Sequence, residues 1–287
     1  MKFITFLTTD NEQKWGIVPN GDTIVDGTGS GYARLLDVIQ GGDPALTEVK
    51  EWFQQGDAKT YAWDEVKILP PIKPLKNVIC VGKNYAEHAL EMSNQDPGAI
   101  PKYPVFFTKP HTALTGHGTY IESYPHITTE LDYEGELAVI IGKEGKNIPA
   151  AEAMDYVFGY SILNDVTARD LQRRHKQFFK GKSLDTFAPF GPVIAHKSLI
   201  PDPQQLTIQT FVNGEERQHG STQDMIFSVA QLIESLSAGM TLEAGDIIAT
   251  GTPSGVGKGF NPPKLLKAGD EVSITIEPIG TLSNRVR

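Results

Sequence analysis

The sequence has a single cysteine, no excess of positive charge and no long apolar run, and each absence excludes a class of protein. The lone thiol, Cys80, rules out an internal disulfide bond and indicates a reducing compartment. The 35 aspartates and glutamates outnumber the 26 lysines and arginines, and the net charge of −9 argues against binding to nucleic acid. No stretch approaches the roughly 20 apolar residues of a membrane-spanning helix, and the apolar run in Met1–Thr8 is too short for a signal peptide. We therefore expect a cytoplasmic protein that contacts neither nucleic acid nor membrane.

Phosphate-binding loops are also missing, although two segments are rich in glycine. Around Lys258, Thr252 stands where such a loop needs glycine, and Gly259 stands where it needs serine or threonine. The segment Gly27–Gly31 lacks the dinucleotide-binding spacing too. The segment Thr250–Gly259 can still cradle a carboxylate through its glycine backbone and a threonine hydroxyl, or it can be a plain tight turn.

Two carboxylates stand in the most informative stretch, Asp132–Glu136, which leads directly into the apolar run Leu137–Ile141. Side chains on a strand alternate between faces, so Glu134 and Glu136 project on the same side. Carboxylates that lie so close beside a core repel each other unless a cation neutralises them or one takes up a proton, and a divalent metal ion is the simplest way to stabilise them. The alternative is a solvated edge strand whose glutamates face water.

A third acid, Asp165, follows an apolar strand-like run and precedes a basic segment. Together with Glu134 and Glu136 it would complete a three-carboxylate site, which suits the octahedral preference of Mg²⁺ or Mn²⁺. Asp165 has an alternative role as the N-cap of the helix that follows, a role that Asn164 or Thr167 would also serve.

A histidine and a glutamate form a candidate catalytic pair. His88 and Glu91 lie three residues apart in a segment of helical composition and so share a helix face, where the carboxylate can orient the imidazole. The alternative is an ordinary solvated pair. The segment Ser93–Pro104 that follows has the proline, glycine and polar content of a mobile loop, and we expect it to close over a substrate.

The pattern of elements predicts an α+β, mostly β architecture. A hairpin is expected at residues 2–8 and 14–18, short helices at 32–40 and 46–55, and a proline-rich connector at 66–74. Strands dominate beyond the connector, with a primed-turn hairpin around Asn213-Gly214, an amphipathic helix at 229–238 and an alternating strand at 271–276. The connector predicts a small N-terminal domain at 1–69 and a larger domain at 70–287.

Four sequence blocks together resemble the fumarylacetoacetate hydrolase family, especially its bacterial acylpyruvate hydrolases, oxaloacetate decarboxylases and hydroxymuconate isomerases. These blocks are Asp132–Leu137, Asn164–Gln172, Gly181–Phe187 and Thr250–Gly257. The resemblance covers residues 70–287, whereas residues 1–69 correspond to a variable N-terminal portion. It implies a mixed β-sheet roll preceded by a small α+β domain, and a homodimer.

The resemblance also implies roles for individual residues. Glu134, Glu136 and Asp165 would bind Mg²⁺ or Mn²⁺, and a dyad on a mobile lid, His88 and Glu91, would activate water. Further roles fall on residues in the blocks: Lys182 and Gln172 would stabilise an oxyanion, and Thr252 with the neighbouring Gly251 would bind the 2-oxo acid end. Outside the blocks, Lys109 ends another strand and is a second choice for a substrate contact, with a solvent-facing strand end as its alternative. Most of the other charges in the stretch Arg169–Lys182 are expected to face solvent on a helix, namely those of Arg173, Arg174, His175, Lys176 and Lys180.

The expected function is metal-dependent cleavage of carbon–carbon bonds in small 2-oxo acids through a metal-bound enolate. Oxaloacetate decarboxylation and acylpyruvate hydrolysis would share that intermediate. One alternative is isomerisation of 2-hydroxyhepta-2,4-diene-1,7-dioate or 5-carboxymethyl-2-hydroxymuconate. An alternative of another class is a ligand-binding regulatory module with vestigial catalysis, which would need no base.

Overall fold

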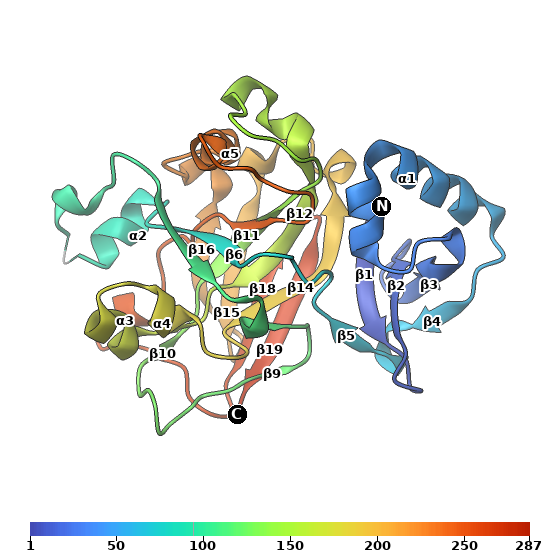
Figure 1. Cartoon of the computed structure of the whole chain (residues 1–287). Helices are drawn as coiled ribbons and strands as arrows, with labels where there is room; N and C mark the ends of the chain where they lie inside the picture. The colour runs from blue at the N-terminus through green and yellow to red at the C-terminus, as the bar shows by residue number, and fades with distance from the viewer. Residues whose placement is uncertain (94) are drawn as a thin grey trace.

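One large mixed sheet dominates the computed structural model in Figure 1, which describes residues 1–93 and 95–287. Its strands are β1 (Lys2–Leu7), β2 (Gln13–Ile17), β3 (Thr23–Asp26), β4 (Thr60–Ala62), β5 (Lys67–Leu69), β6 (Val78–Gly82), β7 (Val105–Lys109), β8 (Leu114–Thr115), β11 (Gly135–Ile141), β12 (Val157–Asn164), β14 (Ala188–His196) and β17 (Ile247–Ala249). The strand order is β4-β3-β2-β1-β14-β12-β11-β17-β6-β7, with β5 paired to β1 and β8 paired to β14.

Two smaller sheets complete the strand content. A five-stranded sheet contains β9 (Tyr120–Ile121), β15 (Thr207–Val212), β16 (Glu215–Ser221), β18 (Glu271–Ile276) and β19 (Gly280–Val286). A two-stranded sheet pairs β10 (Leu131–Asp132) with β13 (Thr167–Ala168).

Helices lie around these sheets (Figure 1). The α-helices are α1 (Leu35–Gln55), α2 (Ala86–Glu91), α3 (Arg169–His175), α4 (Phe179–Lys182) and α5 (Val229–Ser237). Short 3₁₀ helices are η1 (Gly27–Ser30), η2 (Trp63–Glu65), η3 (Pro97–Ala99), η4 (His111–Ala113), η5 (Ala150–Tyr156), η6 (Lys197–Leu199), η7 (Pro203–Gln205), η8 (Thr222–Asp224) and η9 (Gly257–Gly259).

The central strands are apolar along their whole length because both faces of the large sheet are covered. Along β11, Leu137, Val139 and Ile141 enter one hydrophobic cluster, and Ala138 and Ile140 enter another. A strand buried on both faces has no solvent-facing side, so its apolar residues run on without alternation. This is the physical reason for the apolar run that follows the paired glutamates.

The register of three strands brings distant segments to one edge of the large sheet. β11 and β12 are antiparallel, with Gly135 opposite Asn164, so the start of β11 meets the end of β12. β17 is antiparallel to β11 and parallel to β6, so the ends of β17 and β6 reach the same edge. The residues that follow these strand ends therefore converge.

The predicted fold class is confirmed, and several elements lie where the sequence placed them. The hairpin turn has positive φ at Asn213 (52°) and Gly214 (80°), as a primed turn requires. The two helices expected at 32–40 and 46–55 form the single element α1, which breaks at Gly42 (φ 62°, ψ −148°). Residues 1–69 lie at one side of the molecule (Figure 1), but β1 pairs with β14, so the large sheet continues across the proposed boundary. The boundary near residue 69 stays a prediction.

Candidate active site

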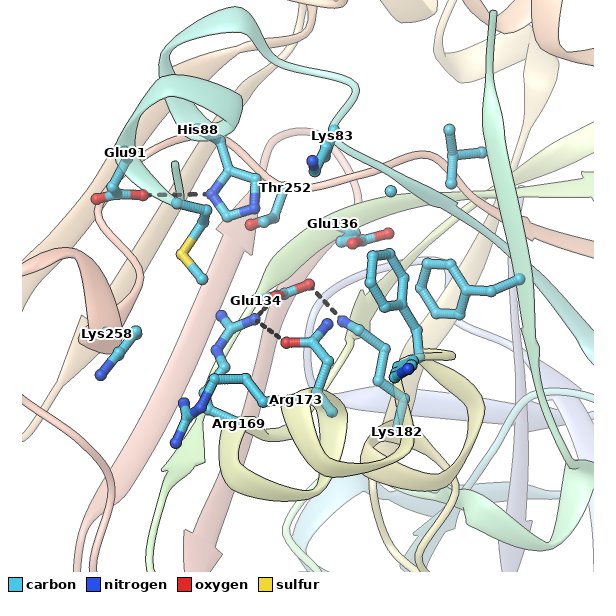
Figure 2. A pocket seen from close by; sticks show the side chains of 17 residues that line it. Lys83, His88, Glu91, Glu134, Glu136, Arg169, Arg173, Lys182, Thr252 and Lys258 are labelled. Carbon is cyan, nitrogen blue, oxygen red and sulfur yellow. Dashed lines mark hydrogen bonds and ion pairs between the residues drawn. The ribbon is translucent and has the colours of Figure 1, made fainter. Parts of the chain in front are cut away.

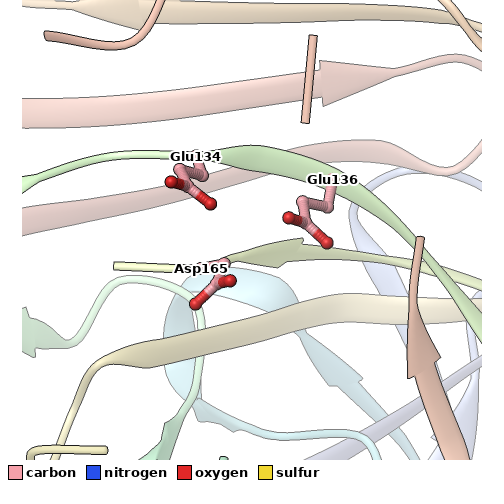
Figure 3. Close-up of side chains that lie close together, drawn as sticks. All are labelled: Glu134, Glu136 and Asp165. Atoms are coloured by element: carbon pink, nitrogen blue, oxygen red, sulfur yellow. The ribbon is translucent and has the colours of Figure 1, made fainter. Parts of the chain in front are cut away.

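Three buried carboxylates meet at the sheet edge (Figure 3). Glu134, Glu136 and Asp165 are 5%, 1% and 0% exposed, and they offer carboxylate oxygens that all lie within 4.8 Å of one another. Glu136 belongs to β11, Glu134 directly precedes it, and Asp165 directly follows β12. The exposed-edge alternative is therefore excluded, and these three residues form an oxygen-donor cluster able to hold a metal ion.

Backbone and amide bonds hold the acids in this arrangement. The Asp165 N–H donates to the Glu134 carbonyl at 2.8 Å, and the Glu134 N–H donates to Asn164 Oδ1 at 3.0 Å. The alternative role of Asp165 as a helix cap is not observed, because Ala168 occupies the N-cap of α3 without a side-chain bond. Both Asp165 oxygens accept bonds from lysines instead.

Three buried cations surround the acids. Lys182 Nζ contacts Glu134 Oε2 at 2.8 Å, Asp165 Oδ2 at 2.7 Å and the Thr167 hydroxyl at 2.9 Å. Lys109 Nζ contacts Asp165 Oδ1 at 2.5 Å, and Arg169 Nη1 contacts Glu134 Oε1 at 2.7 Å. Because Lys109 comes from the last strand of the sheet, β7, this contact also shows that the sheet curves round toward β12.

The cations leave the charge of Glu136 unbalanced. Burial opposes ionisation of Glu134, but Lys182 and Arg169 outweigh it and lower the pKa of this carboxyl to about 2. For Glu136, burial and then the charges of Asp165 and Glu134 raise the pKa well above its ordinary value. Of the three acids, only Glu134 and Asp165 form ion pairs with the described residues, and Glu136 accepts a hydrogen bond from the Gly251 N–H at 2.9 Å. A further cation beside Glu136 would therefore be stabilised.

The loop after β17 supports the cluster through its backbone. Gly251 has φ of 100°, and a Cβ atom there would lie 2.8 Å from the Cβ of Asn84, so this position requires glycine. The hydroxyl of Thr252 donates to the Gly135 carbonyl at 2.9 Å and accepts from Gln218 Nε2 at 2.7 Å. Both residues thus hold the start of β11 in place.

The predicted dyad lies on the wall opposite α3 and α4 (Figure 2). His88 Nδ1 is 3.2 Å from Glu91 Oε2, and both residues belong to α2. His88 is only 6% exposed, so it is not the solvated surface residue of the alternative interpretation. Since Nδ1 contacts the carboxylate, the opposite ring nitrogen, Nε2, is the one available for chemistry.

A cavity of about 490 Å³ joins the dyad to the acids. Its apolar lining includes Val81, Met92, Phe107 and Phe178. The basic side chains that line it are Lys83, Arg169, Arg173, Lys176, Lys182 and Lys258. A cavity with so many cations favours an anionic ligand, despite the acidic charge of the whole chain.

The predicted substrate contacts are distributed unevenly around this cavity. Thr252, Gln172 and Lys182 line it, and so do His88, Glu91, Glu134 and Glu136. Lys109 does not line the cavity, because it is fully buried and bonds to Asp165 and to the Val166 carbonyl. Gly251 likewise contacts Glu136 instead of the cavity. The chemical roles of these residues stay predictions.

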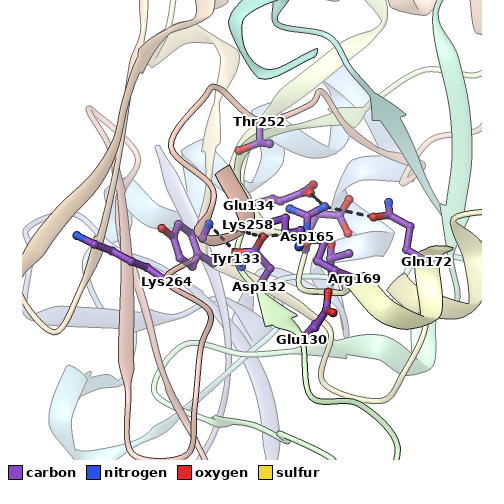
Figure 4. Close-up of polar contacts among 12 residues, drawn as sticks. Glu130, Asp132, Tyr133, Glu134, Asp165, Arg169, Gln172, Thr252, Lys258 and Lys264 are labelled. Atoms are coloured by element: carbon purple, nitrogen blue, oxygen red, sulfur yellow. Dashed lines mark hydrogen bonds and ion pairs between the residues drawn. The ribbon is translucent and has the colours of Figure 1, made fainter. Parts of the chain in front are cut away.

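Arg169 and Asp132 are site residues that the sequence did not single out. Arg169 is 3% exposed, lines the cavity and bonds through Nε to Asp132 Oδ2 at 2.8 Å (Figure 4). The charges that were expected to face solvent are exposed, namely Arg173, Arg174, His175, Lys176 and Lys180. Asp132 also accepts from the backbone N–H groups of Gly257 and Lys258. The position of Arg169 within a motif block, four residues after Asp165, was the available signal.

The loop predicted to close over a substrate is described in part. Asn94 lies outside the described residues, and the loop beyond it contains η3 with Asp96 as its N-cap. No helix in residues 1–93 and 95–287 combines the length and apolar character needed to cross a membrane.

Comparisons with known proteins agree with this geometry. The family model for the fumarylacetoacetate (FAA) hydrolase C-terminal region matches residues 77–287. Oxaloacetate tautomerase YisK of Bacillus subtilis (strain 168) is 56% identical over 260 residues, which cover 88% of this chain and 86% of that protein.

Solved structures show the same relationship. The fumarylacetoacetate hydrolase from psychrophilic Exiguobacterium antarcticum is 45% identical, with a TM-score of 0.87 over 100% of this chain and 99% of that one. The 2-hydroxyhepta-2,4-diene-1,7-dioate isomerase from Mycobacterium marinum is 34% identical, with a TM-score of 0.77 over 100% of this chain and 98% of that one. The matched motifs, the buried acids and these relatives agree, and the chain belongs to the fumarylacetoacetate hydrolase family of enzymes.

Proposed function

We propose that this enzyme interconverts the keto and enol forms of oxaloacetate, or of a closely similar 2-oxo dicarboxylate, through an enolate. The observation that carries the proposal is the buried acid cluster opening into a cavity with a basic lining. An acid cluster that stabilises a cation can act on the 2-oxo acid end, and the basic side chains can attract a second carboxylate. The 56% identity to an oxaloacetate tautomerase supports this substrate class.

A divalent cation, Mg²⁺ or Mn²⁺, fits the residues present. Glu134, Glu136 and Asp165 offer only oxygen donors. The nearby lysines and arginine form ion pairs with Glu134 and Asp165 and leave the charge of Glu136 without a paired cation among the described residues. When bound, the ion would act as a Lewis acid that draws electrons from the 2-oxo group and so acidifies the neighbouring carbon.

The chain's own residues would move and hold the proton. His88 Nε2 removes a proton from C3 of the keto acid, while Glu91 holds the imidazole through Nδ1 and stabilises its cationic form. Arg169 and Gln172 lie on the facing wall, where their donors can stabilise negative charge on the enolate oxygen. Lys182 donates to Glu134, Asp165 and Thr167 already, and it contributes its positive charge. The proton held by His88 then passes to the enolate oxygen, which completes the conversion to the enol and restores the neutral imidazole; the reverse sequence returns the keto acid.

Carbon–carbon bond cleavage is the second candidate, because decarboxylation of oxaloacetate and hydrolysis of acylpyruvates pass through a similar enolate. Loss of CO₂ from oxaloacetate leaves the electron pair on C3 and requires no base to break the bond. Hydrolysis and dienoate isomerisation both require a proton transfer. The similarity to the Mycobacterium marinum isomerase is a reason to assay dienoate isomerisation as well.

The test compares His88→Ala with the wild type on two reactions of one substrate. We expect enol-to-keto conversion, followed by ultraviolet absorbance, to slow roughly 100-fold, because a positioned base contributes about that much. Pyruvate formation from oxaloacetate should change far less. His175→Ala, at an exposed position on α3, is the matched control. Equal losses in both reactions would exclude His88 as the proton-transfer group, and a wild type that forms pyruvate without accelerating tautomerisation would favour the second candidate.

A further inference from the structure

The carboxylate of Glu91 lies between two elements that are distant in the sequence. One oxygen, Oε2, is 3.2 Å from His88 Nδ1 within α2. The other, Oε1, accepts a hydrogen bond of 2.9 Å from the Gly255 N–H, in the loop that follows β17. Glu91 therefore orients His88 only while this loop orients Glu91.

A second contact joins the same two elements. The Ser254 hydroxyl donates to Glu87 Oε2 at 3.1 Å, one turn before Glu91 on α2. The loop thus contacts α2 at two successive turns and contributes to the position of the dyad relative to the cavity.

Gly259, further along this loop, makes room for the Glu91 carboxylate. A Cβ atom built on Gly259 would lie 2.0 Å from Oε1 and 2.3 Å from Cδ of Glu91. Gly259 does not have the positive φ that favours glycine, so its backbone conformation suits any residue. The neighbouring carboxylate, rather than the backbone, is what a side chain at this position would disturb.

We propose that Gly259 is a positioning residue for the His88–Glu91 dyad: its missing side chain, together with the Gly255 N–H, seats the Glu91 carboxylate against His88. The inference rests on the proposed role of His88 as the proton-transfer group. It makes the loop Ser254–Gly259 part of the catalytic arrangement, although Gly259 itself does not line the cavity.

The variant Gly259→Ala separates this role from folding. The atoms that the new methyl group displaces are the far end of a flexible side chain, so the fold can accommodate it by moving the Glu91 carboxylate. We expect the melting temperature to change by no more than a degree or two, while kcat for tautomerisation falls roughly 10- to 100-fold, because small misplacements of a catalytic group cost rates of this order. KM should stay close to that of the wild type.

The matched control is Gly21→Ala, at an exposed glycine where an added Cβ atom would have nothing within 4 Å. Its kcat should equal that of the wild type. In a Glu91→Ala background, Gly259→Ala should cause no further loss, because no carboxylate remains to be displaced. A full additional loss in that background would overturn the proposal.

Nitrogen chemical shifts of the His88 ring give a readout independent of activity. A seated Glu91 accepts from Nδ1–H and so favours the tautomer with an unprotonated Nε2. We expect Gly259→Ala to shift the ring toward the other tautomer, and Gly21→Ala to leave it unchanged. An unchanged tautomer in Gly259→Ala would overturn the proposal even if activity fell. If the wild type proved inactive as a tautomerase, the proposed function would fail, and this shift would still decide whether Gly259 positions the dyad.

Discussion

Glu136 shows how one residue can differ from its neighbours in chemistry while sharing their type and burial. Glu134 and Asp165 are each paired with buried cations, whereas Glu136 bonds to a backbone N–H. Burial raises the pKa of both glutamates, but Lys182 and Arg169 outweigh it at Glu134 and lower that pKa, whereas at Glu136 the charges of Asp165 and Glu134 add to it. The unbalanced acid is the one that most needs a metal ion.

Replacing Glu136 by glutamine should therefore lower metal affinity and activity together. The amide keeps the size and can still accept from the Gly251 N–H, but it removes the unbalanced charge. We expect Mg²⁺ and Mn²⁺ affinity, measured by calorimetry, to fall roughly 100-fold. Glu271→Gln, on the exposed face of β18, should have no effect. Activity that survives exhaustive chelation in the wild type would contradict a metal-dependent reaction.

Lys83 combines an unfavourable backbone with a position on the cavity wall. Its φ of 57° lies in the left-handed region, which costs a side chain such as lysine about 1 kcal/mol. Asparagine tolerates this conformation, so Lys83→Asn should raise the free energy of unfolding by up to about 1 kcal/mol. The same variant should raise KM for a dicarboxylate roughly 3- to 10-fold at low salt, because a cation near the substrate is lost. Lys83→Arg is the control that keeps the charge, and an unchanged KM in Lys83→Asn would remove Lys83 from the binding site.

At the scale of elements, α5 illustrates how local sequence sets the end of a helix. Ser228 accepts from the Gln231 N–H, and the Gln231 side chain accepts from the Ser228 N–H, so two free donors are satisfied reciprocally. The buried residues Leu232, Ile233 and Leu236 then attach the helix to the main hydrophobic cluster.

Ser228→Ala should destabilise the protein by about 1 kcal/mol, because an N-cap bond is lost. Denaturant unfolding measures this change. Ser235→Ala, at an exposed position within the same helix, removes a hydroxyl without removing a cap and should be neutral or slightly stabilising. Equal destabilisation by both substitutions would show that the cap contributes nothing.

At the scale of the whole molecule, His196 links stability to pH. Its ring lies 5.4 Å from that of Phe158, and Nδ1 accepts from the Ser198 N–H at 3.2 Å. Burial first, and then the charges of the chain's amino terminus, Lys50 and Lys197, lower the pKa of His196 from 6.5 to about 4, while Asp43 opposes this shift. The folded protein therefore holds this imidazole neutral at pH values where the unfolded chain protonates it.

The sign of the effect follows from the depressed pKa. Between pH 6.5 and about 4 the unfolded state binds the extra proton, so stability falls as the pH falls through this range. We expect a loss of up to about 2–3 kcal/mol from this group. His196→Asn should flatten that part of the curve of unfolding free energy against pH, whereas His126→Asn, at an exposed position, should leave it unchanged. A curve of the same slope in His196→Asn would assign the pH dependence to other groups.

The expected homodimer is also a prediction at this scale, and sedimentation would test it.

The sequence by itself determined the parts of this protein that depend on near neighbours in the chain. Glu134 and Glu136 share a side because strand side chains alternate, and His88 meets Glu91 because a helix turns once in three to four residues. The glycine-requiring turn at Asn213-Gly214 was readable for the same reason. Asp165 could be proposed as the third acid from its place at the end of an apolar strand, but its alternative role as a helix cap stayed open until the resemblance of four motif blocks favoured the metal site.

Only the tertiary structure decided which groups share the charge of the acids. Lys109 contacts Asp165 across 56 positions of sequence, and this contact exists because the sheet curves until β7 approaches the end of β12. Likewise, Arg169 is buried because Asp132 and Glu134 both pair with it, although its local segment is basic enough to suggest a solvated helix. Sheet curvature and the burial of ion pairs depend on how distant segments pack together, and no local pattern carries that information.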